Sequence, residues 1–179
     1  MREHRGSREF YSGKLNERDM LGEYRPTAEY IRKYKELSKD GKYLPYRQSM
    51  DLVREYHQED PTNPSKPFAN ELRLSIAEEL GLETEQDMDR LKFFSAVNSG
   101  SLDFHHGVDA WIELLPKDKS ERSAIVTMDV TLRETVGKSD KADVIIGQVP
   151  DPSEDEKKFM KLVYEEYGPD IAGQIQQQI

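Results

Sequence analysis

Apolar residues recur at helical spacing in two stretches of the first third of the chain. Between Arg25 and Asp40, and again between Gln48 and His57, they fall three and four positions apart and define one apolar face. A proline stands near the first turn of the first stretch, where no intrahelical N–H is needed. We therefore predict two amphipathic helices, which make up a helical extension over residues 24–60.

The segments that flank this extension lack such spacing. Residues 1–23 contain glycines, alternating charges and few aliphatic side chains, which predicts a flexible basic arm with at most transient helix. Residues 60–67 contain three prolines and predict a break in regular structure. We place the boundary of the main body at this break and expect the body to span residues 66–179.

The body opens with two further helical patterns. Asn70 is a suitable N-cap for a helix whose apolar stripe ends at Gly81. Thr84 and Asp87 have the spacing of a capping box and predict a second, shorter helix. Residues 93–97 fit either the end of that helix or a strand.

Alternating apolar and polar positions then indicate strands. Residues 107–115 and 124–132 alternate throughout, and residues 142–149 form a more continuously apolar run. The eight residues 116–123 suit the loop of an antiparallel hairpin. We predict an α+β fold in which a small mixed or antiparallel sheet is flanked by helices.

A last helix is predicted near the end of the chain. Ser153 and Glu156 have capping-box spacing, and an apolar repeat follows them. Gly168 and Pro169 are expected to end this helix. The glutamine-rich residues 174–179 fit either a short helix or a frayed tail.

The predicted hairpin brings two acidic residues together. If its strands pair symmetrically around the loop, Asp109 lies opposite Asp129 on one face of the sheet. Directly opposed like charges destabilise a sheet by up to about 1 kcal/mol. A bound Mg²⁺ or Mn²⁺ would offset that cost, since these ions prefer one or two carboxylates with waters and phosphate oxygens. The alternative is structural: each aspartate bonds a nearby backbone N–H or pairs with Arg133 or Lys141.

Two histidines precede the first of these aspartates. Neutral imidazole suits a metal ligand or a general base, so His105 and His106 are candidates for either role near Asp109, and we select His106 as a candidate catalytic residue. The same pair also fits a structural role in the turn that enters the strand.

The order of these residues resembles the PD-(D/E)XK superfamily of restriction-endonuclease-like nucleases. The resemblance covers roughly residues 70–147: a helix, a strand with Asp109, a strand with Asp129, and a third strand. In that family an aspartate and an acidic residue on the next strand hold the metal, which implies this role for Asp109 and Asp129. The lysine that helps to position the attacking water stands two residues after the second acid, where this chain has Thr131.

The resemblance implies two further site residues. An acid on the first helix of that family joins the metal site, which points to Glu71; the alternative is an ordinary solvent-facing helix charge. A relocated lysine or arginine would have to replace the missing one, and the candidates are Arg133, Lys138 and, as our choice, Lys141. Only nine residues, 133–141, connect the second and third strands, too few for the long crossover helix of that family.

Charge and composition narrow the classes of function. The net charge is −9, but it is unevenly distributed: residues 1–50, the basic front, carry +4, and residues 51–179 carry −13. Because the acidic part repels phosphates, nucleic acid would have to contact the basic front or bound metal ions. The chain has no cysteine, which excludes disulfides, thiolate catalysis and cysteine-ligated zinc. It has neither an apolar run of 18 residues nor an apolar signal core, so we expect no membrane span and a cytoplasmic protein.

The basic front is also rich in tyrosine. Such a surface can follow a phosphate backbone and stack on bases. Tyrosines at helical spacing equally fit the packing face of an amphipathic helix with lysines beside it. Six of the nine tyrosines lie here: Tyr11, Tyr24, Tyr30, Tyr34, Tyr43 and Tyr46.

Two functions remain open at this stage. The first is metal-dependent phosphodiester hydrolysis on nucleic acid, with Asp109 and Asp129 holding Mg²⁺ or Mn²⁺ and the basic N-terminal helices guiding the substrate. The second is a non-catalytic module that binds protein or nucleic acid through the basic, tyrosine-rich N-terminal region. Thr131 favours the second, because threonine offers no positive charge to a scissile phosphate.

Overall fold

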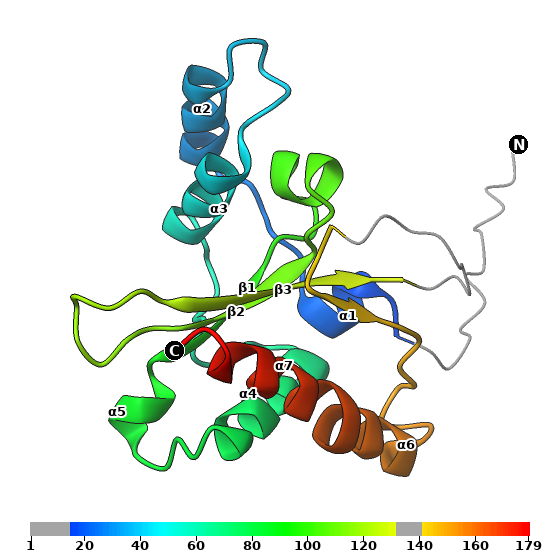
Figure 1. The fold of residues 1–179 in the computed structure, drawn as a ribbon. Helices are drawn as coiled ribbons and strands as arrows, with labels where there is room; N and C mark the ends of the chain where they lie inside the picture. The colour runs from blue at the N-terminus through cyan, green and yellow to red at the C-terminus, as the bar shows by residue number, and fades with distance from the viewer. Residues whose placement is uncertain (1–14, 132–140) are drawn as a thin grey trace, which may run out of the picture.

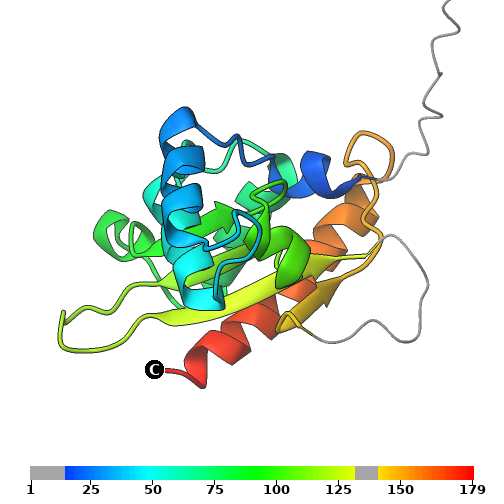
Figure 2. The same ribbon diagram turned by 90° about the horizontal axis from the view of Figure 1, so that it is seen from above.

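A four-stranded sheet lies at the centre of the computed structural model, which describes residues 15–131 and 141–179. The strand order is β1-β2-β3-β4, with antiparallel pairing among the first three strands and parallel pairing of β3 with β4. Helices cover both faces of the sheet (Figures 1 and 2), so the α+β class is as predicted. The strands are β1 (Leu91–Ser95), β2 (Ala110–Leu114), β3 (Ala124–Val130) and β4 (Val144–Ile146).

Alternation along the strands sends side chains into two separate cores. Ala110 and Ile112 of β2 lie in the larger core, whereas Trp111 between them lies in the smaller core on the opposite face. Residues 93–97 fit either a helix end or a strand by their sequence, and the first three of them belong to β1. Phe93 and Phe94 are buried on opposite faces of the sheet, as alternation along a strand requires. Phe94 stacks on Trp111 with ring centroids 4.7 Å apart.

The layer above the sheet in Figure 1 contains α2 (Ala28–Leu37) and α3 (Tyr46–Glu55), with the π-helical turn η1 (Ser101–His105) beside them. Thr27 caps α2, since its hydroxyl oxygen accepts a hydrogen bond from the N–H of Tyr30 at 3.1 Å. The predicted helical extension therefore packs against the sheet and completes the smaller core. Its buried apolar residues are Tyr24, Tyr30, Leu44, Met50, Leu52 and Val53.

The layer below the sheet contains α4 and the C-terminal helical segment, which cross beneath the strands (Figures 1 and 2). The short helix α5 follows α4 and is capped by Thr84, as predicted. The elements of this side are α4 (Pro67–Glu79), α5 (Glu85–Met88), α6 (Glu156–Lys161), the π-helical η2 (Leu162–Tyr167) and α7 (Gly168–Gln176).

Helix α4 begins earlier than its predicted cap. Asn70 lies inside the helix, where its N–H donates to the carbonyl of Lys66 at 2.9 Å. Pro67 occupies the first turn, and Phe68 beside it is fully buried, so core packing extends the helix by one turn. The start of α6 is displaced in the opposite direction, from Ser153 to a cap formed by Asp155.

The prediction that Gly168 and Pro169 end the C-terminal helix is wrong. The chain stays helical from α6 through η2 into α7, and Gly168 itself has a helical φ of −59°. The wider π-turn of η2 accommodates the proline, which has no N–H to donate and whose ring crowds the preceding turn. Glycine is needed at this point because a Cβ would overlap Oγ of Ser75 on α4.

Helix α1 (Glu17–Leu21) lies in the stretch that the sequence assigns to the flexible arm. The side chain of Asn16 caps it, and both Met20 and Leu21 are buried in the larger core. A helix of this length gains little from local propensity, so the burial of these two side chains is what stabilises it. The core therefore takes in part of the predicted arm, whose residues 1–14 lie outside the described ranges.

No helix within the described ranges has the length and apolar character needed to cross a membrane.

Candidate functional site

The β2–β3 hairpin has the register that its loop predicts. Trp111 pairs with Thr127 and Ala110 with Met128. Asp109 immediately precedes β2; its N–H donates to the carbonyl of Met128 at 2.9 Å, and its side chain is hydrogen-bonded to that of Asp129, the next residue of β3. The predicted adjacency of the two aspartates is therefore confirmed.

Asp109 is the buried member of this acidic pair, with only 4% of its surface exposed. Its Oδ2 accepts a hydrogen bond of 2.7 Å from the N–H of Val130, and its carboxyl group also shares a hydrogen bond with Asp129. Burial, and then the neighbouring Asp129, raise the pKa of Asp109 to about 8, against the opposing effect of the Val130 N–H. At neutral pH the pair consequently retains a proton between its two carboxyl groups.

Glu17 is a third acid near this pair, and it is one that the sequence reasoning missed. Its negative charge contributes to the raised pKa of Asp109. It stands in the first turn of α1, a helix that the composition of residues 1–23 does not predict. The sequence does contain a signal for this helix. Asn16 and Asp19 have the spacing of a helix cap, and they stand just before the apolar pair that α1 buries.

The candidate base His106 is engaged with the loop between α2 and α3. Its Nε2 lies 2.8 Å from the carbonyl oxygen of Leu44, so the ring nitrogen that faces this carbonyl carries the proton and donates. His105 bonds the carbonyl of Lys42 in the same way, at 3.2 Å. The histidines thus join two loops, which corresponds to the structural alternative left open by the sequence.

The candidate lysine is also directed to a backbone carbonyl. Lys141 Nζ donates to the carbonyl of His105 at 3.2 Å, and its aliphatic stem packs beside Gly107. Thr131 continues the sheet instead, since its N–H donates to Ile146 at 2.8 Å. The other candidate cations, Arg133 and Lys138, lie outside the described residues.

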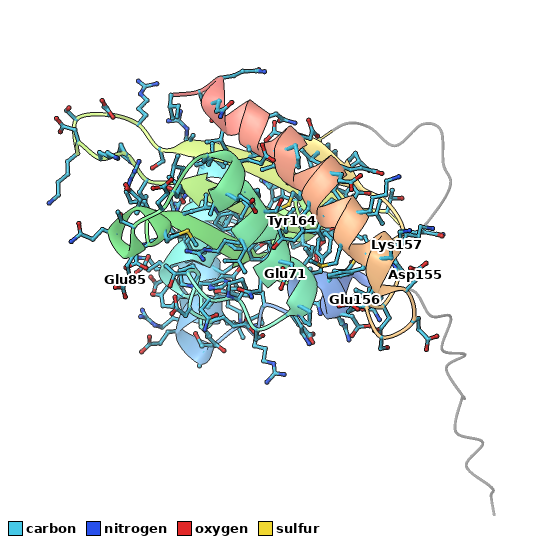
Figure 3. All side chains as sticks on the ribbon, turned by 90° about the horizontal axis from the view of Figure 1, so that it is seen from below. Glu71, Glu85, Asp155, Glu156, Lys157 and Tyr164 are labelled. Atoms are coloured by element: carbon cyan, nitrogen blue, oxygen red, sulfur yellow. The ribbon has the colours of Figure 1, made fainter. Side chains whose placement is uncertain are left out.

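Glu71 lies between α4 and η2, on the lower side of the sheet (Figure 3). Its Oε2 accepts a hydrogen bond of 2.7 Å from the hydroxyl group of Tyr164. Burial and this hydrogen bond from Tyr164 to Glu71 raise the tyrosine pKa to about 12. Glu71 therefore links two helices of the lower layer.

Asp143 caps the edge of β3. Its Oδ2 accepts hydrogen bonds from the N–H and the hydroxyl group of Thr127, at 2.8 and 2.7 Å. The N–H of Asp143 returns a bond of 3.0 Å to the Thr127 hydroxyl oxygen. Asp143 and Thr127 thus bond each other reciprocally through side chain and backbone.

A separate charged group lies on the upper face of the sheet. Arg54 Nε lies 3.0 Å from the buried carboxylate of Glu113, and Arg54 Nη1 lies 2.7 Å from Asp51. The guanidinium group also stands over Trp111, 5.8 Å from the ring centroid. Trp111 is fully buried, so its ring serves packing and is closed to a ligand.

The tyrosines of the front differ in burial, and Tyr34 is partly buried against the smaller core. Tyr24 and Tyr30 are buried in the smaller core, as the packing interpretation expects. Tyr43 and Tyr46 are 51% and 41% exposed and remain open to a partner. Tyr11 lies outside the described residues.

The chemistry of the acidic pair suits a hard divalent cation. Asp109 and Asp129 supply carboxylate oxygens, and one or two carboxylates with waters are what Mg²⁺ prefers. In residues 15–131 and 141–179, no group of three or more His, Asp or Glu side chains is arranged to hold a metal ion. A cation at this point would have only Asp109 and Asp129 of the described residues as carboxylate ligands.

Comparison of the chain with models of protein families, with curated proteins and with solved structures finds no match.

Proposed function

We propose that the protein hydrolyses phosphodiester bonds of nucleic acid with Mg²⁺ or Mn²⁺ held by Asp109 and Asp129. The observation that carries the proposal is the hydrogen bond shared by these two carboxyl groups in a buried position. Such a pair keeps a proton where two free carboxylates would repel each other. A divalent cation can replace that proton and satisfy both oxygens.

The surrounding residues support this role. The N–H of Val130 fixes Oδ2 of Asp109, so the backbone of β3 positions the carboxyl group. Glu17 adds negative potential, which strengthens the attraction for a cation. When bound in a site of this kind, the ion polarises a phosphate oxygen and lowers the pKa of a coordinated water. The resemblance to PD-(D/E)XK nucleases assigns the same pair of positions to the metal.

A second candidate is nucleic-acid binding without hydrolysis, and one specific observation favours it. The family places a lysine two residues after the second acid, where this chain has Thr131. Lys141, the candidate replacement in the described part of the chain, donates to the carbonyl of His105. Under this alternative the acidic pair is a structural element, and nucleic acid contacts the basic N-terminal side.

Calorimetric titration with Mn²⁺ at a pH above about 8 tests the metal site. The wild-type protein should bind, Asp129→Asn should abolish the heat, and the exposed hairpin-loop variant Asp118→Asn should bind like wild type. Affinity should fall as the pH is lowered through the pKa of Asp109, because protons then compete with the metal. Absence of heat from the wild-type protein would contradict the proposed site.

Incubation of the metal-loaded protein with labelled single-stranded and double-stranded DNA and RNA tests hydrolysis. Cleavage that Asp109→Asn abolishes supports the enzyme. Cleavage that survives this substitution comes from a contaminating nuclease and counts against it. Nucleic-acid binding without cleavage in the presence of bound Mn²⁺ favours the non-catalytic alternative.

A further inference from the structure

Five aromatic rings form a continuous run on the upper side of the molecule. Successive ring centroids lie 5.1 Å apart from Phe104 to His105, 5.5 Å from His105 to Tyr43, 5.6 Å from Tyr43 to His106 and 5.6 Å from His106 to Tyr46. We call these five residues the aromatic run. They come from two segments: the loop that leads into α3 with the first residue of that helix, and the π-helical turn η1 (Ser101–His105) with the residue after it. Figure 1 shows η1, in green, beside that loop above the sheet.

The aromatic run is open to solvent at three of its rings. Phe104 is 81% exposed, the highest value among the exposed large apolar side chains of the described residues, and Tyr43 and Tyr46 are 51% and 41% exposed. An exposed apolar ring at such a level contributes nothing to core packing. Clustered aromatic rings on a surface instead mark a place where a partner binds.

Hydrogen bonds hold the two segments in place beneath the rings. His105 and His106 each bond a carbonyl of the loop, those of Lys42 and Leu44. The buried Ser101 hydroxyl group bonds both the N–H and the carbonyl of Leu44, at 3.2 and 3.1 Å. The rings are therefore preorganised, which lowers the entropy that a ligand must overcome on binding.

Cationic side chains accompany the aromatic run. Lys42 and Arg47 adjoin Tyr43 and Tyr46 in the sequence, and Lys141 Nζ bonds the carbonyl of His105. All three are exposed, and no ion pair joins them to another residue in the described ranges. Their positive charge suits the phosphates of a nucleic acid.

The run ends at a groove between α3 and β3. Its volume is about 460 Å³, within the range of small-ligand sites. Arg54 in its wall is already paired with two carboxylates, so Arg47 is the cation that remains for a ligand. The groove is lined by Tyr46, Arg47, Met50, Asp51, Arg54, Ile125, Thr127 and Asp143.

We infer that the aromatic run is a binding platform for single-stranded nucleic acid. Bases stack on Phe104, Tyr43 and Tyr46, the phosphate backbone passes the three cations, and the strand enters the groove at Tyr46. A single strand fits because its unpaired bases can turn their faces to the rings, whereas a duplex presents only backbone and groove edges. The inference rests on the proposed function for the choice of nucleic acid, but it places binding at residues outside the acidic pair.

Fluorescence anisotropy with a labelled oligothymidylate tests the platform. The measurement uses the whole protein in EDTA, so neither metal binding nor cleavage is needed. We expect Tyr43→Ala and Phe104→Ala each to weaken binding by roughly fivefold to a hundredfold, the range for loss of one base stack. Tyr43→Phe, which keeps the ring, should bind like wild type. Met160→Ala removes an exposed apolar side chain of α6 and serves as the matched control.

Two further measurements test the inference independently: one changes a charge of the protein, and the other changes the strand type of the ligand. Arg47→Gln should reduce the salt dependence of binding by about one phosphate contact. A duplex of the same sequence should bind more weakly than the single strand. Tighter duplex binding, equal binding by the alanine variants, or no binding of any oligonucleotide at low salt would overturn the inference.

The results separate this inference from the proposed function. Binding that depends on Tyr43 and Phe104 in a protein that cleaves nothing supports the platform and contradicts the enzyme. Cleavage that depends on Asp109 but is unaffected by the ring substitutions supports the enzyme and contradicts the platform.

Discussion

The side-chain amide of Gln178 forms both hydrogen bonds of a strand neighbour with Ile125. It accepts from the Ile125 N–H and donates to the Ile125 carbonyl, each at 2.9 Å. The strand β4 pairs only with Met128–Val130 of β3, so the beginning of β3 is an open edge of the sheet. Gln178 closes this edge, which would otherwise present unpaired backbone groups to other chains.

Removal of this amide should expose the edge. We expect Gln178→Ala to accelerate hydrogen exchange at the Ile125 amide and to promote self-association at high protein concentration. Exchange measured by NMR and sedimentation velocity check the two effects. Gln177→Ala changes a neighbouring exposed glutamine and should alter neither. Unchanged protection at Ile125 would show that the side-chain amide does not cap the strand.

The raised pKa of Asp109 predicts that stability depends on pH. Its folded pKa of about 8 lies above the value of about 3.9 in an unfolded chain, so the folded state binds more protons between these values. The stabilising contribution is complete below about pH 4 and is lost as the pH rises through about 8. Each pKa unit corresponds to about 1.4 kcal/mol, so the free energy of unfolding should fall by several kcal/mol over this window.

Urea denaturation at a series of pH values measures this contribution. Asp109→Asn keeps an acceptor for the Val130 N–H and removes the ionisable group. The variant should lack this fall and should be more stable than wild type above about pH 8. Asp118→Asn, in the hairpin loop, should retain the wild-type slope. Parallel curves for wild type and Asp109→Asn would mean that Asp109 is ionised throughout.

The contact between Gly168 and Ser75 predicts a severe substitution. A Cβ at position 168 would overlap Oγ of Ser75 and lie 2.8 Å from the carbonyl oxygen of Val163. Gly168→Ala should therefore lower the free energy of unfolding by about 1–3 kcal/mol, as overpacking does, despite the higher helix propensity of alanine. Ser75→Gly in the same chain should restore part of the loss. Gly173→Ala, where a Cβ meets nothing, is the control in the same helix.

The ion pair between Arg54 and Glu113 predicts that removing the cation alone destabilises the protein more than removing both charges. Arg54→Met leaves the Glu113 carboxylate buried without its cation and should destabilise the protein by about 3 kcal/mol. Arg54→Met combined with Glu113→Leu removes both charges and should be more stable than Arg54→Met alone. Chemical denaturation of the four proteins in this cycle gives the coupling. Additive effects would show that solvent screens the pair.

The central part of the fold could be predicted from local pattern. Alternation over the two strands and a loop of suitable length determine the hairpin register, so the adjacency of Asp109 and Asp129 follows from the sequence alone. Burial of that pair could not be read in the same way. The acid Glu17, whose charge acts on this pair, belongs to α1, and α1 is held by two apolar side chains that contact a core assembled from distant segments.

The destinations of the other candidate residues depend on tertiary contacts. His106 bonds the backbone carbonyl of Leu44, and Lys141 bonds that of His105. No side-chain motif in the sequence predicts that a backbone carbonyl will be the partner. Glu71 meets a tyrosine only because α4 and η2 pack side by side. Sequence spacing indicates which face of a helix a charge occupies, but not which element the fold will place against that face.

The aromatic run is built jointly by a loop near the start of the chain and a turn near its middle. A ligand that stacks on Tyr43 and Phe104 together would act as a reversible crosslink between those segments. By thermodynamic linkage, its binding free energy would be added to the cost of separating the α2–α3 layer from the sheet. Occupancy of this surface would then be measurable far from the rings, as slower opening of the smaller core around Trp111.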